Sequence, residues 1–259
     1  MNKKLYYLLG ILLLIIGWIG LYFYYDNPLV IPSPIDVLEG LINLFSSKPI
    51  KINMGETIIS LDNTLENISS TLIRTLKAFL ISYLIGLIFA TIAAKSEKIE
   101  ELFKPLFSTL RAIPTISLIF VFIMIIGFVK APYYIVFIIS FPIIYQAILE
   151  GYKNIDSELK LVNKLDNYNP IKNYFMFTFP MLKTSLITAF ISSFALSFKI
   201  EVMAEILTGS PRLKGLGFLI LDNRNYNNIS MVISLSLLII ILSIVLEFIG
   251  KMLLKLIKE

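Results

Sequence analysis

The sequence predicts an all-α, polytopic membrane protein with about six transmembrane helices, and composition is the first reason. Of its 259 residues, 57% are hydrophobic and only 16% are charged, and the mean hydropathy is +0.81. This apolar excess is larger than a soluble domain uses for its core. The apolar residues also fall in long blocks, and a helix needs about 20 of them to cross a hydrocarbon layer of about 30 Å.

Six apolar blocks predict the individual spans. They cover residues 5–25, 72–94, 106–129, 133–149, 184–207 and 229–254. The first block follows Lys3 and Lys4, as in a signal peptide, but it is too long for one and ends in the aromatic run 22–25, so we expect it to be retained. The blocks lack the strict alternation of barrel strands. Residues 1–259 are therefore expected to form one transmembrane domain.

The distribution of cationic residues predicts the orientation. With the N-terminus inside, the inner segments hold thirteen of them: Lys3, Lys4, Lys95, Lys98, Lys104, Lys153, Lys160, Lys164, Lys172, Lys183, Lys251, Lys255 and Lys258. The outer segments hold six: Lys48, Lys51, Lys130, Arg212, Lys214 and Arg224. Cytoplasmic loops carry the excess of Lys and Arg, so both termini are predicted to be cytoplasmic. The net charge of +5 is explained in the same way, without nucleic acid.

Two connections are too long to be simple turns. In the outer one, Ser33 suits a helix cap, Pro34 suits the first helical position and Asp36 favours the positive helix end, which predicts an amphipathic segment over 33–45. Its apolar stripe either lies on the outer membrane surface or packs against the helix bundle.

The inner connection, 151–179, contains a second amphipathic pattern. Leu159, Val162 and Leu165 form one apolar stripe, and Lys160 and Lys164 flank it. A charged amphipathic helix on the cytoplasmic side indicates a docking surface, for membrane lipid or for another protein.

The composition excludes several classes of chemistry. The chain has no Cys and no His, which removes thiol nucleophiles, the commonest general base and the commonest metal ligands. No G-x-x-x-x-G-K-[ST] pattern occurs, so any ATP has to be handled by a partner. The glycine-flanked segment 209–215 lacks the Lys-Ser/Thr ending of a phosphate loop. We expect no catalytic residue, metal site or cofactor in this chain.

Three ionisable residues lie within the predicted span 184–207. They are Lys199, Glu201 and Glu205, and each costs about 2.5 to 3.5 kcal/mol at the bilayer centre, so they should face a partner helix or a water-filled path. Glu201 and Glu205 are one turn apart and share a face, whereas Lys199 points elsewhere. All three are candidates for the translocation pathway. The plainer alternatives are that Glu205 sits at the outer interface and that Lys199 snorkels or pairs with a carboxylate.

Several short motifs, in order along the chain, resemble the membrane-spanning permease subunits of bacterial ABC importers, in particular the nitrate/sulfonate/taurine group. The matching residues are Pro32-Ser33-Pro34; Thr71-Leu72-Ile73-Arg74-Thr75-Leu76 with Phe79; Pro105-Leu106, Leu110-Arg111-Ala112-Ile113-Pro114 and Gly127; and Ala204-Glu205 followed by Gly215-Leu216-Gly217-Phe218-Leu219-Ile220. Each piece is weak alone, but four pieces at the right intervals make a strong resemblance.

The chain departs from this family in its cytoplasmic signature, Glu-Ala-Ala-x-x-x-Gly. The following Leu-Pro-x-Leu ending is matched by residues 179–182, which places the signature around 160–167, but the Ala pair and the Gly are missing. Asn167 is a candidate replacement for the Gly, because Asn also tolerates a left-handed helix end. In the family this segment is the coupling helix, so the resemblance assigns ATPase coupling to Leu159, Lys160, Val162, Lys164, Leu165 and Asn167.

The resemblance implies a type I ABC importer permease in the bacterial inner membrane. It implies two ATPase subunits that carry the ATP, a second permease copy, and an extracytoplasmic substrate-binding protein. It suggests small anions such as sulfonates or nitrate as substrates. The rival hypothesis is a self-sufficient secondary transporter or channel that uses Glu201, Glu205 and Lys199 for ion coupling. A membrane enzyme would need a Glu as its base, without help from His or Cys.

Overall fold

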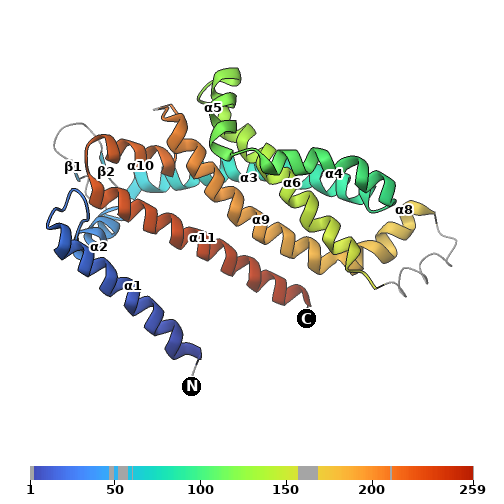
Figure 1. Ribbon diagram of the computed structural model, residues 1–259, viewed down its shortest axis with the longest axis horizontal. Coiled ribbons are helices and arrows are strands. Elements are labelled where there is room, and N and C mark those ends of the chain that lie inside the picture. Colours follow the sequence, from blue (N-terminus) through green and yellow to red (C-terminus); the bar gives the residue numbers. More distant parts are fainter. Residues whose placement is uncertain are drawn as a thin grey trace. The chain divides into compact units, whose positions relative to one another are not determined.

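The computed structural model describes residues 3–46, 50–51, 58–59, 61–156, 169–210 and 212–258. Its chain divides into two compact units, residues 1–70 with 211–241 and residues 71–210 with 242–259, and two long helices run through both. These helices are α3 (Leu61–Ala93) and α11 (Ile229–Lys258) (Figure 1). Apart from one short strand pair, the regular structure of the described residues is helical, which confirms the all-α prediction.

The first unit holds α1 (Lys3–Tyr25), α2 (Pro34–Asn43), α10 (Leu216–Asn225) and the strands β1 (Ile50–Lys51) and β2 (Ile58–Ile59), which pair antiparallel. Helix α2 begins as its sequence predicts. The Ser33 hydroxyl accepts a hydrogen bond from the Asp36 amide, the Asp36 carboxylate accepts one from the Ser33 amide, and Pro34 occupies the first turn.

The buried side of α2 packs against α11. The Ser234 hydroxyl donates to the Val37 carbonyl oxygen at 2.8 Å, and Val37 is fully buried. Gly40 lies directly beside Ser234, where a Cβ atom would collide with that hydroxyl. The predicted amphipathic segment therefore uses part of its surface for helix packing.

The second unit holds α4 (Glu97–Ala112), α5 (Thr115–Ile126), α6 (Ala131–Lys153), α8 (Pro170–Asn173), the π-helix η1 (Tyr174–Thr178) and α9 (Phe179–Thr208). Helices α6 and α9 lie side by side (Figure 1). Aromatic rings fill much of the core: Phe107 stacks on Tyr145 with ring centres 3.8 Å apart, and Phe79 meets Phe190 and Phe194 edge to face.

Helices α4 and α5 depart from the single span predicted over 106–129. They meet at an angle of 90°, with Ile113 and Pro114 extended between them. Proline disfavours the helical conformation of the residue before it and removes a backbone donor, and α4 ends at Ala112, just before Ile113 and Pro114. Figure 1 shows α5 turned sharply away from α4.

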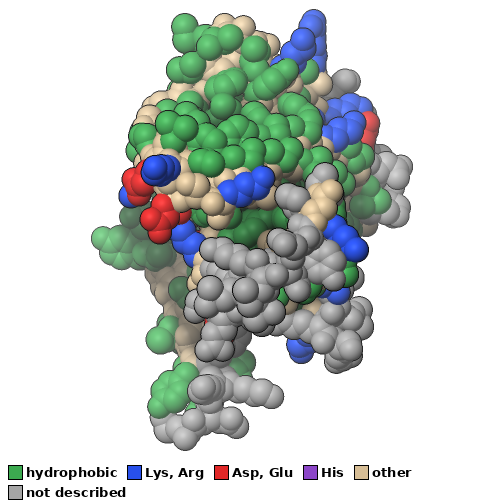
Figure 2. Space-filling view, turned by 90° about the vertical axis from the view of Figure 1, so that its right-hand side faces the viewer, with side chains coloured by type: hydrophobic (Ala, Val, Ile, Leu, Met, Phe, Trp, Pro, Cys, Tyr) green, Lys and Arg blue, Asp and Glu red, His purple; other side chains and the backbone are tan. Residues whose placement is uncertain are grey.

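Among the described residues, five helices are long and apolar enough to cross a membrane, and the bent α4–α5 pair would supply a sixth span. The five stretches are 8–25, 63–93, 131–153, 174–208 and 229–252. In Figure 2, hydrophobic side chains form a broad continuous area, and Lys, Arg, Asp and Glu gather in a few places beside it. The predicted number of about six transmembrane helices is confirmed.

Close helix approach in the second unit gives a first testable prediction. Gly86 of α3 faces α6, where an added Cβ would lie 2.9 Å from Ile144 Cγ2 and 3.3 Å from the Tyr145 amide nitrogen. We expect Gly86→Ala to lose about 1 to 3 kcal/mol of stability by overpacking, because Ile144 is β-branched and stiff. Thermal unfolding of the purified chain in detergent measures this.

Gly17→Ala is the matched control for this substitution. Nothing lies within 4 Å of the Cβ position at Gly17, and both glycines are in helices. In both variants, replacing Gly by Ala in a helix contributes about 1 kcal/mol of helix propensity to stability, so this contribution cancels in the comparison. Equal unfolding temperatures for the two would show that α3 and α6 do not approach closely at Gly86.

Candidate functional site in the membrane-spanning helices

A buried ion cluster joins α3 to α9 in the second unit. The Arg74 guanidinium donates through Nε to Glu201 Oε1 and through Nη2 to Glu205 Oε1. The two carboxylate side chains are 0% exposed, and the Arg74 side chain is 19% exposed. The Thr71 hydroxyl adds hydrogen bonds to both oxygens of Glu205, at 2.8 and 3.1 Å.

Helical spacing places these groups opposite one another. Thr71 and Arg74 are three residues apart on α3, and Glu201 and Glu205 are four apart on α9, so each pair occupies one side of its helix. A charge inside the hydrocarbon layer is tolerated when it faces the interior and has a partner. The cluster meets this condition for all three charges.

Further polar contacts continue along the same packed helices. The hydroxyls of Ser140 on α6 and Ser197 on α9 are 2.7 Å apart, and the Ser82 hydroxyl on α3 donates to the Ala78 and Phe137 carbonyl oxygens. The Tyr83 hydroxyl donates to the Leu186 carbonyl oxygen at 2.9 Å. Interhelical hydrogen bonds of this kind hold helices together within a bilayer.

Lys199 lies apart from the cluster. It is exposed, whereas Glu201 and Glu205 are fully buried, as expected for residues on different sides of α9. The structure thus brings together two of the three predicted pathway residues and separates the third. Neither carboxylate faces open space in this conformation.

Sequence reasoning missed the role of Arg74 and Thr71. Arg74 was noted only as part of the family-like motif 71–76. The available signal was that a cation on one predicted span and two carboxylates on another need partners of opposite charge. No three His, Cys, Asp or Glu side chains gather as a metal site within the part of the chain that the structure describes.

A second candidate region is a cleft of about 1020 Å³ in the second unit. Its lining includes Thr91, Glu100, Tyr152, Lys153 and Tyr174. The Tyr152 hydroxyl lies 2.8 Å from the Thr91 hydroxyl and donates to the Tyr174 hydroxyl at 3.3 Å. Lys153 Nζ pairs with Glu100 Oε1 at 2.5 Å.

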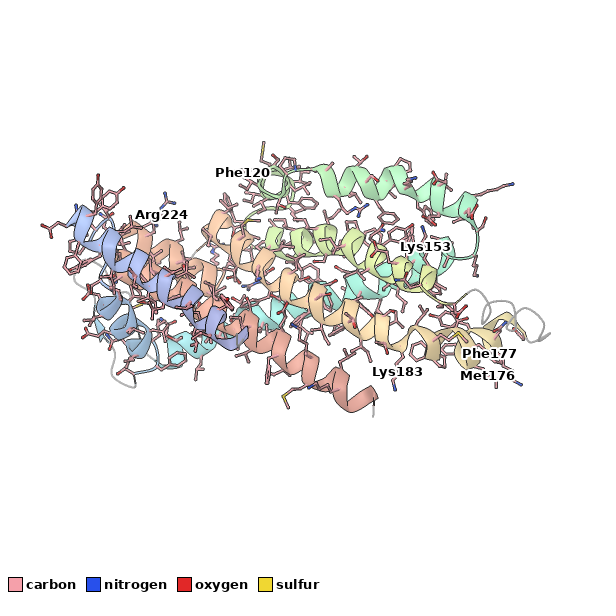
Figure 3. The ribbon with its side chains drawn as sticks, turned by 60° about the horizontal axis from the view of Figure 1, so that its bottom comes forward. Phe120, Lys153, Met176, Phe177, Lys183 and Arg224 are labelled. Carbon is pink, nitrogen blue, oxygen red and sulfur yellow. The ribbon has the colours of Figure 1, made fainter. Side chains whose placement is uncertain are left out.

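This cleft lies where the chain leaves α6 and where it returns through η1. Figure 3 shows Lys153 near the end of α6, and Met176 and Phe177 on η1. The six residues assigned to ATPase coupling, Leu159, Lys160, Val162, Lys164, Leu165 and Asn167, lie outside the described residues. The cleft therefore flanks the predicted coupling segment in the sequence.

The loop after α9 is held to the start of α3 in the first unit. The Gly215 amide donates to Asn67 Oδ1 at 2.6 Å, and Lys214 Nζ pairs with Glu66 Oε1 at 2.6 Å. Gly209 ends α9 with φ of 58°, in the left-handed region that glycine adopts without strain. These contacts give the glycine-flanked segment 209–215 a structural explanation.

The fold is shared with solved ABC transporters. The inward-facing MetNI methionine ABC transporter matches with TM-scores of 0.63 and 0.64 in two crystal forms, at 17% and 16% identity, over 74% and 75% of this chain and 94% and 96% of those chains. An amino acid ABC transporter crystallised with histidines matches with a TM-score of 0.60, at 15% identity, over 76% of this chain and 93% of that one. At such identities the likeness establishes the fold alone.

The family is established by sequence. No match was found among curated proteins. Residues 82–259, well over half of the chain, match the family model described as "Binding-protein-dependent transport system inner membrane component". The chain is a multi-pass membrane protein that belongs to this family of inner-membrane transport components.

Proposed function

We propose that this chain is the membrane-spanning permease of an ATP-driven importer for a small anion of the nitrate, sulfonate or taurine type. It works as a homodimer with two ATPase subunits and receives its substrate from an extracytoplasmic binding protein. The observation that carries the proposal is the family match over residues 82–259. The motifs shared with the nitrate/sulfonate/taurine group support the substrate class.

In this proposal, ATP binding closes the ATPase pair and moves the coupling segments at Leu159, Val162 and Leu165. The spans then rock between inward-open and outward-open states. The Arg74 cluster keeps α3 and α9 together during that motion, because Arg74 on α3 binds both carboxylates of α9.

The rival, a self-sufficient secondary transporter or channel, needs an ion-coupling carboxylate that an ion path reaches. Glu201 and Glu205 are 0% exposed and bonded to Arg74, which favours a structural role in this conformation. Lys199 is the remaining charged candidate for the path.

Uptake in cells tests the substrate class. Cells that produce this chain with its ATPase and binding protein are given labelled taurine, an alkanesulfonate, nitrate or methionine. We expect uptake of taurine, the alkanesulfonate or nitrate, and none when this chain is omitted. Uptake of methionine alone would contradict the anion assignment and leave the importer class intact.

The proposed topology gives a separate prediction. The chain has no cysteine, so single cysteines report their side without background. With both termini inside, Glu97→Cys is protected from a membrane-impermeant thiol reagent in intact cells, and Arg224→Cys is labelled, since the positive-inside count places them on opposite sides. Both positions are exposed on the protein. The reverse labelling pattern would invert the topology.

A further inference from the structure

One side of α9 is open and unusually polar for a helix of this hydropathy. Along residues 184–199 its exposed positions are Thr184, Thr188, Ser192, Leu196 and Lys199. They recur every three or four residues and therefore lie on one side of the helix. We call these five positions the open stripe. Ser197 and Glu201, which contact α6 and α3, are buried.

The exposed faces of two neighbouring helices are different. On α11, the six exposed residues from 240 to 249 are apolar: Ile240, Ile241, Ile244, Val245, Phe248 and Ile249. Such a face suits lipid tails. Glu247, whose side chain is 47% exposed, pairs with Lys251 one turn further on. On the open stripe, four of the five side chains are polar, and one of them is charged. Four polar side chains on one side of the helix make the open stripe better suited to water than the apolar face of α11 is.

Lys77 of α3 provides a comparison within the same molecule. Helices α3 and α9 run antiparallel, because Thr71 contacts Glu205 and Tyr83 contacts Leu186. Lys77 and Lys199 are therefore at about the same level along the two helices, and both are exposed. Lys77, however, is surrounded on its helix by exposed apolar side chains: Ile73, Leu76, Leu80, Ile81 and Leu84.

We propose that the open stripe lines the aqueous substrate path and that Lys199 is its anion-selecting residue. This inference rests on the proposed permease function and assigns the charge preference to one side chain. A lysine ammonium offers three donors and no acceptor, which matches the oxygens of a sulfonate or nitrate. No ion pair of Lys199 occurs within the described part of the chain.

The nearby carboxylates do not cancel this charge. Glu201 and Glu205 are turned toward α3, where Arg74 binds both of them. A cation beside a water-filled path with low-dielectric walls raises the local concentration of anions by about 10-fold or more. The open stripe accordingly combines hydroxyl groups, which do not discriminate by charge, with one group that does.

The test measures charge preference without knowing the substrate. Ser192 lies two turns from Lys199 on the same side of α9. The Ser192→Cys variant is placed in proteoliposomes with its ATPase, and its thiol is reacted with negatively and positively charged methanethiosulfonate reagents. Rates are divided by those of a free thiol in solution. We expect the anionic reagent to be favoured about 10-fold. Adding Lys199→Met should abolish this ratio, Lys199→Arg should keep it, and Lys77→Met should leave it unchanged.

Two outcomes would overturn the inference. If Ser192→Cys reacts no faster than Ile244→Cys on the apolar face of α11, the open stripe is covered by lipid or by a second copy of the chain. If it reacts without a charge preference, or if Lys77→Met has the same effect as Lys199→Met, Lys199 is not the selecting residue. ATP-driven uptake is measured in the same proteoliposomes, so a failure of the permease function is seen separately from a failure of the stripe.

Discussion

Arg74→Met is expected to destabilise the folded chain by about 3 to 5 kcal/mol, the largest stability change of any substitution considered. The variant leaves Glu201 and Glu205 buried, at 0% exposure, without their shared cation. An unpaired buried charge costs more than the pair itself contributes, so the loss exceeds the value of an ordinary ion pair. Thermal unfolding of the purified chain in detergent, with ligand absent, measures the change.

Two further variants separate this explanation from a general loss of packing. Arg74→Met combined with Glu201→Gln and Glu205→Gln should recover much of the lost stability, because no unpaired charge remains. Lys77→Met removes an exposed cation from the same helix and should change stability by about 0.5 kcal/mol or less. An Arg74→Met variant as stable as the unaltered chain would show that the cluster does not form.

Leu165→Asp is expected to have the largest effect on coupling. If Leu159, Val162 and Leu165 bury against the ATPase, a charge at the centre of that contact costs about 2 kcal/mol or more in binding. ATP hydrolysis should then be uncoupled from uptake, while the chain still inserts into the membrane. Co-purification of the ATPase, measured together with uptake, gives the result.

Lys160→Ala is the control for this variant. An exposed ion pair is worth about 1 kcal/mol or less, so this change should weaken the complex only slightly. If Leu165→Asp keeps both the ATPase and uptake while Lys160→Ala loses them, the segment docks through its charged side or lies on lipid.

The sequence predicted the fold class because apolar block length is a direct physical requirement of the bilayer. It placed the second span at 72–94, whereas α3 begins at Leu61. The extra turns contain Thr64 and Asn67, which read as polar loop residues but are buried, and Asn67 bonds Gly215. The hydropathy of the sequence does not predict tertiary hydrogen bonds of this kind.

The break between α4 and α5 was only partly predictable. Pro114 disfavours a helical conformation at Ile113, but the sequence alone does not give the 90° angle between the two helices. The separation of Lys199 from Glu201 and Glu205 followed from helical periodicity alone. Helical periodicity did not identify the partner of Glu201 and Glu205, because Arg74 is on a different span and the chain has several other cations.

We propose that this chain moves solute only when a partner subunit hydrolyses ATP. Uptake into proteoliposomes that contain the chain and its ATPase measures this dependence. The binding protein and a substrate identified by the cell assay are placed on the side of substrate entry. We expect uptake when ATP is supplied on the ATPase side, no uptake without ATP, and no uptake when the ATPase is omitted. Uptake by the chain alone, driven by a proton or sodium gradient, would contradict the proposal and favour a secondary transporter.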